Sequence, residues 1–371
     1  MRAWSILLSL QKMATRIANR GIAADERVIF FPTNAVQVNE THWTVPIHGW
    51  IFEPEEDSRK RKAFLSLFRR MLKVPSNSTE DLILKHRIRA FLVDNERSKT
   101  PVITLAGQEY RMMPSGKNGH FRTNLTIADS QLRENNEEDT YKDRYVKFHA
   151  VSDNKEVQYT GMVHLVPPNG VTIVSDIDDT IKITNVVNKR AMLRNTFMKE
   201  FEPVPGMAEV YQKWAKEWEN CRLHLLSSSP YQLYEELDLL RQRAGFPLAT
   251  YTLKLIRPKS AVQALRIMLE DPQEFKRNAL VKLFQDYPSR KFILVGDTGE
   301  RDPDVYAAVA RMYPHQVLGI FLRHVPRDEV DDVPARVQMS MGGVAPGTWM
   351  IFQHASELDE IVIIHRSQES R

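Results

Sequence analysis

The sequence predicts an α/β protein with a doubly wound, mostly parallel sheet, preceded by a β-rich, sandwich-like domain. From about 27 to 168, apolar residues alternate with polar ones at a period of two, as in half-buried antiparallel strands. From 171 onward, short apolar runs alternate with helical stretches, which favours parallel strands covered on both faces. The length of 371 residues favours two domains, and Pro167-Pro168-Asn169-Gly170 separates the two patterns. We therefore expect domains at 27–168 and 169–371.

The β-rich region contains alternating apolar residues that predict strands around 43–47, 88–92, 146–150 and 157–166. One helix interrupts them, because apolar residues recur at helical spacing at Phe64, Leu67, Phe68, Met71 and Leu72, with basic residues around them. This helix has two possible roles. It could dock on anionic lipid, or its basic face is solvated while its apolar stripe packs on the β-rich domain.

The second region has four apolar runs, which predict strands at 171–174, 223–226, 292–295 and 317–322. Helical patterns lie at about 206–219, 231–243, 276–286 and 303–313. The helical stretches alternate with the apolar runs, and this alternation is the basis of the parallel sheet predicted above.

The first 26 residues form a leader segment that fits two interpretations. An apolar stretch from Trp4 to Leu10 follows Arg2, and the small residues Gly21, Ala23 and Ala24 precede Asp25. A secretory signal has such a layout. An amphipathic surface helix fits equally well, because the segment before Asp25 is basic and contains no acid. The compartment stays open, as a soluble, peripheral or secreted protein.

The composition excludes several classes of protein. Hydrophobic residues make up 42% and charged residues 26%, which is typical of a soluble globular chain. No apolar run approaches the roughly 18 residues that span a bilayer. The net charge of +4 is small for this length, so we expect no nucleic-acid partner. A single cysteine, Cys221, excludes a disulfide framework.

Polar residues directly follow three of the predicted strands. These residues are Ser175, Asp176, Asp178, Asp179 and Thr180 after the first, Ser227 to Ser229 after the second, and Gly296, Asp297, Thr298, Gly299 and Asp302 after the third. Parallel strands bind ligands outside their carboxyl ends, so these groups are expected to converge on one rim. An acid after a strand is more often a turn former or helix cap, which is the interpretation we favour for Asp179.

Converging acids and hydroxyls suit phosphoryl chemistry. Neighbouring carboxylates repel one another unless a cation neutralises them, and oxygen-rich clusters suit Mg²⁺. Hydroxyls and backbone N–H groups at a helix start can bind phosphate. One carboxylate can attack phosphorus, and a second can move the proton. The sequence therefore predicts a magnesium-dependent phosphatase.

The same residues resemble the haloacid dehalogenase superfamily. Asp176-Ile-Asp178-Asp-Thr180 matches its Asp-x-Asp-x-Thr signature, and Gly296-Asp297-Thr-Gly-Glu-Arg-Asp302 matches its metal-binding motif. Within it, residues 171–325 resemble the actin patch protein type of phosphatidate phosphatase. Phe30-Phe-Pro32 and His48-Gly-Trp-Ile-Phe-Glu-Pro54 resemble more weakly the leader domain of bacterial relatives.

The resemblance implies a role for each motif residue. Asp176 would be the nucleophile, and Asp178 the general acid and base. The implied metal ligands are Asp176, Asp178 through its carbonyl, and Asp297, with Asp302 in support. The implied phosphate-binding and loop-stabilising hydroxyls belong to Thr180, Ser227 and Ser228.

The family also needs a lysine, and we assign it to Lys276. This residue opens the helix that precedes the run 292–295, so it is expected on the active-site rim. A cation at a helix N-terminus is unfavourable by a few tenths of a kcal/mol, roughly, so a reason other than helix stability is plausible. Lys282 would lie farther from the rim.

Three functions remain open on the sequence. The resemblance implies that the chain converts phosphatidate to diacylglycerol, with a phospholipid substrate at a membrane surface. A phosphatase of soluble phosphomonoesters is the alternative. The third is an inactive scaffold associated with membrane or cytoskeleton. The short stretch between Asp176 and Ser227 leaves little room for a large cap domain.

Overall fold

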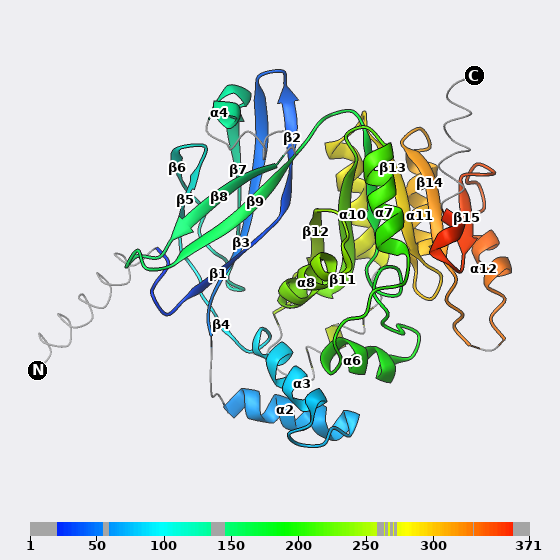
Figure 1. Ribbon diagram of the computed structural model, residues 1–371, viewed down its shortest axis with the longest axis horizontal. Coiled ribbons are helices and arrows are strands. Elements are labelled where there is room, and N and C mark those ends of the chain that lie inside the picture. Colours follow the sequence, from blue (N-terminus) through cyan, green and yellow to red (C-terminus); the bar gives the residue numbers. More distant parts are fainter. Residues whose placement is uncertain are drawn as a thin grey trace, which may run out of the picture. The chain divides into compact units, whose positions relative to one another are not determined.

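The computed structural model describes residues 21–54, 59–134, 145–257, 273–328 and 330–358, with 263, 266, 267 and 270 in the remaining gap (Figure 1). Two compact units share the chain: residues 1–56 with 92–166, and residues 57–91 with 167–371. The first twenty residues of the predicted leader lie outside the described part. None of the described helices has the length and apolar character needed to cross a membrane.

The first unit is a β-rich, largely antiparallel sheet whose described strands follow the order β1-β3-β2-β9-β8-β5-β6, with β4 and β7 also paired to β3. The exception is the β2–β9 pair, which is parallel. Its elements are β1 (Arg27–Phe31), β2 (Thr33–Asn39), β3 (His42–Glu53), β4 (Asp94–Asn95), β5 (Val102–Leu105), β6 (Gln108–Arg111), β7 (His120–Ala128), α4 (Asp129–Glu134), β8 (Tyr145–Val151) and β9 (Gln158–Val166).

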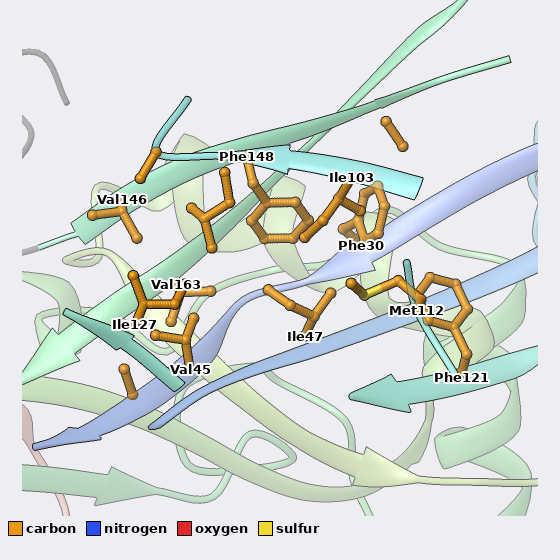
Figure 2. Close-up of a cluster of buried hydrophobic side chains, with 14 of the residues drawn as sticks. Phe30, Val45, Ile47, Ile103, Met112, Phe121, Ile127, Val146, Phe148 and Val163 are labelled. Atoms are coloured by element: carbon orange, nitrogen blue, oxygen red, sulfur yellow. The ribbon is translucent and has the colours of Figure 1, made fainter. Parts of the chain in front are cut away.

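Aromatic rings and aliphatic side chains from several strands fill the core of this unit (Figure 2). Phe30 packs edge-on against Phe148, with ring centroids 4.8 Å apart. Two glycines allow this packing: a Cβ at Gly49 would lie 2.3 Å from the Phe121 ring, and one at Gly161 would lie 2.2 Å from the Phe148 ring. The alternating pattern seen in the sequence therefore corresponds to one buried face of the sheet.

The second unit contains a six-stranded parallel sheet with the order β12-β11-β10-β13-β14-β15. Its strands are β10 (Val171–Ser175), β11 (Arg222–Pro230), β12 (Ala249–Lys254), β13 (Lys291–Asp297), β14 (Val317–Arg323) and β15 (Trp349–Phe352). Its helices are α6 (Lys189–Phe197), α7 (Met207–Glu217), η1 (Tyr231–Leu233), α8 (Tyr234–Ala244), α10 (Gln273–Asp286), α11 (Asp302–Met312), α12 (Val333–Ser340) and η2 (Ala355–Leu358). The expected α/β fold with a parallel sheet is confirmed.

The order of the strands indicates where on this sheet a ligand is expected to bind. The chain proceeds outward from β10 through β11 to β12, and then returns to the other side of β10 with β13. In open parallel sheets, ligands bind beyond the carboxyl ends of the strands where the order reverses. That point lies between β10 and β13, whose register pairs Ser175 with Val295.

Helices pack on both sides of the central strands. Phe284 of α10 stacks on Phe292 of β13, with ring centroids 4.0 Å apart. Trp214 of α7 contacts Phe321 of β14 at 5.5 Å between centroids. Phe321 is in register with Val295, three residues from Phe292, so these two contacts lie on opposite faces of the sheet.

The segment 57–91 belongs to the second unit, although its sequence lies within the β-rich half. It forms two helices, α2 (Arg59–Leu72) and α3 (Thr79–Arg89). Phe68 of α2 contacts Phe197 of α6 edge-on at 5.2 Å. The apolar stripe of the predicted helix therefore packs inside the second unit, whereas the sequence suggested the β-rich domain. Leu65 and Leu72 of the same helix are also buried.

The strand predicted at 88–92 is wrong. Ile88 lies in α3, where it shares the buried helical face with Leu84 four residues earlier. Ser78 caps this helix by accepting a hydrogen bond from the N–H of Asp81. Short apolar alternation over five residues cannot distinguish a strand from a helix whose polar face is interrupted.

Candidate active site

Asp176 leaves the end of β10 and lies at the reversal point of the sheet. Its backbone N–H donates to the carbonyl of Val295 on β13 at 2.9 Å, so the parallel pairing continues one residue past the strand. The Ser175 hydroxyl donates to the Asp176 carbonyl at 2.6 Å and accepts from the Tyr211 hydroxyl at 2.8 Å. Only 1% of Asp176 is exposed. Sheet geometry thus fixes this carboxylate in a buried position.

Lys276 from α10 reaches the same point. Its ammonium lies 2.8 Å from Asp176 Oδ1, 2.7 Å from Asp302 Oδ1 and 3.3 Å from Glu300 Oε2. Burial alone would lower the pKa of Lys276, but the surrounding carboxylates raise it well above its usual value. The side chain therefore carries its charge. The structure brings together the lysine and the first aspartate that sequence reasoning selected.

A group of three carboxylates can hold a metal ion beside this lysine. Asp176, Asp297 and Glu300 each offer an oxygen within 4.8 Å of the others. Asp297 Oδ1 accepts from the N–H groups of Gly299 and Glu300, at 2.6 and 3.0 Å. Among the described residues, Asp176 Oδ2 and Asp297 Oδ2 are buried without a hydrogen-bond partner. Two unpartnered buried oxygens fit a hard divalent cation.

The carboxylates have titration properties that agree with a cation site. Burial raises the pKa of Asp176, Asp297 and Glu300, and neighbouring carboxylates raise it further against the opposing effect of Lys276. One ammonium does not balance this concentration of acid. A divalent cation would supply the missing positive charge.

The sequence analysis did not select Glu300 as a metal ligand. Asp302 is not among the three carboxylates that can hold the metal ion. Glu300 follows Asp297 by three residues in the turn after β13, and this spacing was the available signal. Asp302 is fully buried and bonds Lys276 and the N–H of Asp297, at 2.7 and 3.3 Å. Through these contacts Asp302 supports Lys276 and the loop after β13.

The carboxylate of Asp178 is not one of the three that can hold the metal ion, and it has four polar neighbours. Its Oδ1 contacts Lys182 Nζ at 2.7 Å and accepts from the Thr184 hydroxyl at 2.8 Å. Its Oδ2 accepts from the Ser227 and Ser229 hydroxyls at 3.1 and 3.0 Å. Burial would raise the pKa of Asp178, but Lys182 and the hydroxyl donors lower it to about 2. Asp178 is therefore ionised in this arrangement.

The predicted phosphate-side hydroxyls fall into two groups. Ser227 is engaged, since it donates to Asp178 and accepts from the N–H of Ser229. The hydroxyls of Thr180 and Ser228 are buried and have no hydrogen-bond partner among the described residues. The register of β11 shifts between Leu226 and Pro230, so the serine run lies at an irregular part of the strand.

Asp179 is the turn former that the sequence favoured. Its φ of 54° is in the left-handed region, which aspartate tolerates better than most residues. Its carboxylate accepts from the N–H groups of Thr184, Asn185 and Val186 at 2.8, 2.9 and 2.6 Å. Arg323 donates to its carbonyl at 2.9 Å. Asp179 thus shapes the loop that carries its two neighbouring aspartates.

Residues 171–324 match the family model described as phosphatidate phosphatase APP1, catalytic domain. This segment of the chain is similar to that family. The family resemblance drawn from the motifs is confirmed. The matched APP1 segment contains every site residue named above, and it begins after the β-rich unit, α2 and α3.

Two curated relatives share part of the chain. Phosphatidate phosphatase APP1 of Saccharomyces cerevisiae is 30% identical over 192 residues, which are 51% of this chain and 31% of the relative. Uncharacterized protein C29B5.04c of Schizosaccharomyces pombe is 29% identical over 187 residues, 49% of this chain and 30% of the relative. The match spans less than a third of the length of either relative.

The solved structures that match include the crystal structure of a putative β-phosphoglucomutase from Thermotoga maritima, with a TM-score of 0.32 and 10% identity. The match covers 53% of this chain and 98% of that one.

Proposed function

We propose that this chain is a magnesium-dependent phosphatase that forms an aspartyl phosphate on Asp176 and converts phosphatidate to diacylglycerol. The observation that carries the proposal is the buried Asp176 carboxylate, held by Lys276 on one oxygen and left unpartnered on the other, beside Asp297. The APP1 catalytic-domain match and the printed name of the S. cerevisiae relative support the phosphoric monoester hydrolase class and the lipid substrate.

The proposed chemistry assigns a step to each residue. Asp176 attacks phosphorus, and the bond between phosphorus and the leaving oxygen breaks. Asp178 donates a proton to that oxygen and later takes one from the water that hydrolyses the aspartyl phosphate. Asp178 is ionised in the arrangement described above, but an anionic phosphoryl group beside it would raise its pKa because like charges oppose ionisation.

The remaining polar groups hold the substrate and the cation. The open hydroxyls of Thr180 and Ser228 would donate to phosphoryl oxygens, with Ser227 beside them. Asp176, Asp297 and Glu300 would hold the Mg²⁺, together with the backbone carbonyl of Asp178. When bound, the ion reduces repulsion between the anionic nucleophile and the phosphate.

We assign the sheet to the doubly wound, haloacid dehalogenase type. The outward strand order on each side of β10 and β13 supports this, as do the opposite-face contacts of α7 and α10. We further propose 27–168 and 169–371 as the two domains, with 57–91 contributing helices to the second.

A membrane-embedded substrate is supported by two further features. The connection from β10 to β11 carries only α6 and α7 as regular helices, so no large cap is inserted there. The sequence Arg59–Leu72 of α2 holds six basic residues and no acidic one. Since its Leu65, Phe68 and Leu72 are buried, the exposed Arg70 and adjacent Lys73 would face anionic headgroups.

A phosphate-release panel tests the proposal. The purified chain is assayed on dispersed phosphatidate, sugar phosphates and nucleotides, each with Mg²⁺ and with EDTA. We expect release from phosphatidate that EDTA abolishes. Higher kcat/KM on soluble phosphomonoesters would favour the alternative phosphatase, and inert protein on every substrate would favour a scaffold.

A further inference from the structure

Lys182 is a buried cation that none of the motif roles explains. Its side chain is 1% exposed, and its ammonium lies 2.7 Å from Asp178 Oδ1 and 2.6 Å from the Thr184 hydroxyl. The same ammonium lies over the ring of Phe201, 4.6 Å from its centroid. Burying an ammonium is costly unless it is paired, so its partners show what it is placed to hold.

The backbone of Lys182 fixes the position from which it reaches Asp178. Its N–H donates to the carbonyl of Ile177 at 2.9 Å, and its carbonyl accepts from the N–H of Asp179 at 2.7 Å. These bonds close the loop that carries Asp178. The side chain therefore starts from a fixed point four residues beyond the aspartate that it contacts.

Phe201 restricts the ammonium from another side. The guanidinium of Arg87 lies over the same ring at 3.9 Å, and Arg87 donates to the carbonyl of Thr196 at 2.6 Å. The ring is thus held between α3 and the active-site loop. The attraction between a cation and an aromatic face is stronger where water is excluded. Lys182 has little freedom to turn away from Asp178.

The two oxygens of Asp178 are held from two directions. Lys182 and Thr184 engage Oδ1, and the serine hydroxyls engage Oδ2. Ser227 and Ser229 lie on β11. The same strand carries Ser228, whose buried hydroxyl has no hydrogen-bond partner among the described residues. Lys182 and Thr184 thus hold the oxygen of Asp178 that the serine hydroxyls do not engage. Removing it would release one side of the carboxylate.

We propose that Lys182 is a positioning residue that holds the Asp178 carboxylate in line with the leaving oxygen of the substrate. This inference rests on the proposed function. In the step concerned, the phosphorus–leaving-oxygen bond breaks, the bond from phosphorus to Asp176 forms, and the proton on Asp178 moves to the leaving oxygen. Loss of alignment therefore matters most where the leaving oxygen needs that proton.

The test compares a leaving group that needs a proton with one that does not. Phosphatidate releases an alkoxide unless it is protonated, whereas p-nitrophenyl phosphate releases a stable phenolate. Release of each leaving group is measured in single turnover with enzyme in excess, so that the later hydrolysis step does not contribute. The variants are Lys182→Met, Lys182→Arg and Thr184→Val, with Lys282→Met as the control. Lys282 is exposed on α10 and pairs with Asp286.

We expect Lys182→Met to slow release from phosphatidate by about 100-fold or more, the usual contribution of a positioned acid. Release from p-nitrophenyl phosphate should fall by less than about tenfold, with no change in the enzyme concentration that gives half of the maximal rate. Lys182→Arg should recover part of the lost rate. Thr184→Val should also slow release from phosphatidate more than release from p-nitrophenyl phosphate, but by a smaller factor than Lys182→Met. Lys282→Met should match the wild type on both substrates.

Equal losses on both substrates would overturn the proposal, because they indicate general damage to the site. Wild-type rates in Lys182→Met would overturn it too. If Lys182→Met does not fold, Lys182→Arg and Thr184→Val still give the ratio of the two rates, and an unchanged ratio in both refutes the inference. Wild-type protein without activity on either substrate would instead refute the proposed function.

Discussion

At the scale of single residues, the site is a balance of buried charge. One ammonium, Lys276, faces three carboxylates within 3.3 Å, and the Asp297 carboxylate lies beside them. This balance explains why a lysine occupies the first turn of α10 despite the unfavourable helix dipole. The attraction between Lys276 and these carboxylates is larger than the cost of placing a cation at a helix N-terminus, which is roughly a few tenths of a kcal/mol.

We expect Lys276→Met to lower both activity and stability. The substitution leaves Asp176, Asp302 and Glu300 without their cation, and breaking a buried ion pair costs about 3–5 kcal/mol. Phosphate release should fall by a factor of about 100 or more. Urea unfolding measures the stability, and added Mg²⁺ should restore part of it. Lys282→Met serves as the matched control, and unfolding curves that superimpose for the two variants would contradict the charge balance.

The sequence indicated most of this site, and the reason is local. Asp176, Asp178, Asp297 and the serines follow predicted strands directly, so the strand-end rule finds them. Glu300 and Lys182 lie in loops, where only the folded path of the chain decides which side chains meet. For Glu300 the only signal was its spacing of three residues from Asp297, and for Lys182 the motifs gave none.

At the scale of elements, the start of β10 depends on one arginine. Arg290 is fully buried and donates to the Thr172 hydroxyl and to the carbonyls of Pro167, Asn169, Val171 and Asn220. Its guanidinium joins the segment before β10 to the turn before β11 and to the start of β13. The distances are 2.6–2.9 Å, so all five acceptors are well placed.

We expect Arg290→Met to lower the free energy of unfolding by about 3 kcal/mol or more, because several buried carbonyls lose their donor. Arg290→Lys should recover little, since an ammonium cannot reproduce the planar fork. Arg311→Met is the control, because Arg311 also donates to two carbonyls but is exposed. Urea unfolding that gives the same loss at both positions would contradict this role.

The sequence predicted the central strands of the parallel sheet correctly but did not predict its two edge strands. The predicted runs at 171–174 and 292–295 became β10 and β13, which are buried on both faces and read as continuous apolar stretches. The edge strands β12 and β15 were not predicted. Ala249–Lys254 mixes small and polar residues, and Trp349–Phe352 is half-exposed and only four residues long. Edge strands lack the apolar signal of central ones.

At the scale of the whole molecule, a pair of buried histidines makes the β-rich unit sensitive to acid. In the β-rich unit, His48 and His120 are buried and lie 3.1 Å apart between their ring nitrogens. Burial and the nearby Arg122 lower the pKa of His120 to about 3, and burial lowers that of His48 as well. Both rings are therefore neutral when this unit is folded at neutral pH.

We expect the β-rich unit to lose stability as the pH falls below about 6.5. The unfolded chain binds protons on these histidines at the ordinary pKa, whereas the folded unit does not until the pH is much lower. Between pH 6.5 and 5, wild type should therefore lose about 2 kcal/mol more than His120→Gln, which removes one of the two titrating rings. Urea unfolding at both pH values measures this, and parallel losses in the two proteins would contradict it.

The arrangement of the chain between the units could not be predicted from composition. The sequence 57–91 lies between strands of the β-rich unit, yet its helices belong to the catalytic unit because Phe68 and Phe91 pack on Phe197. Such long-range packing leaves no local signal. The second unit includes the chain from Pro167 onward, which is the first residue of the proline pair at 167–168.

The central claim is that Asp176 carries the phosphoryl group. It is tested by acid-quenching the protein during turnover of phosphatidate with Mg²⁺ and locating the phosphoryl group by mass spectrometry. We predict a labile acyl phosphate on the peptide that contains Asp176, absent with EDTA and absent in Asp176→Asn, which should also lose activity by several powers of ten. Phosphate release at the wild-type rate by Asp176→Asn would contradict the account.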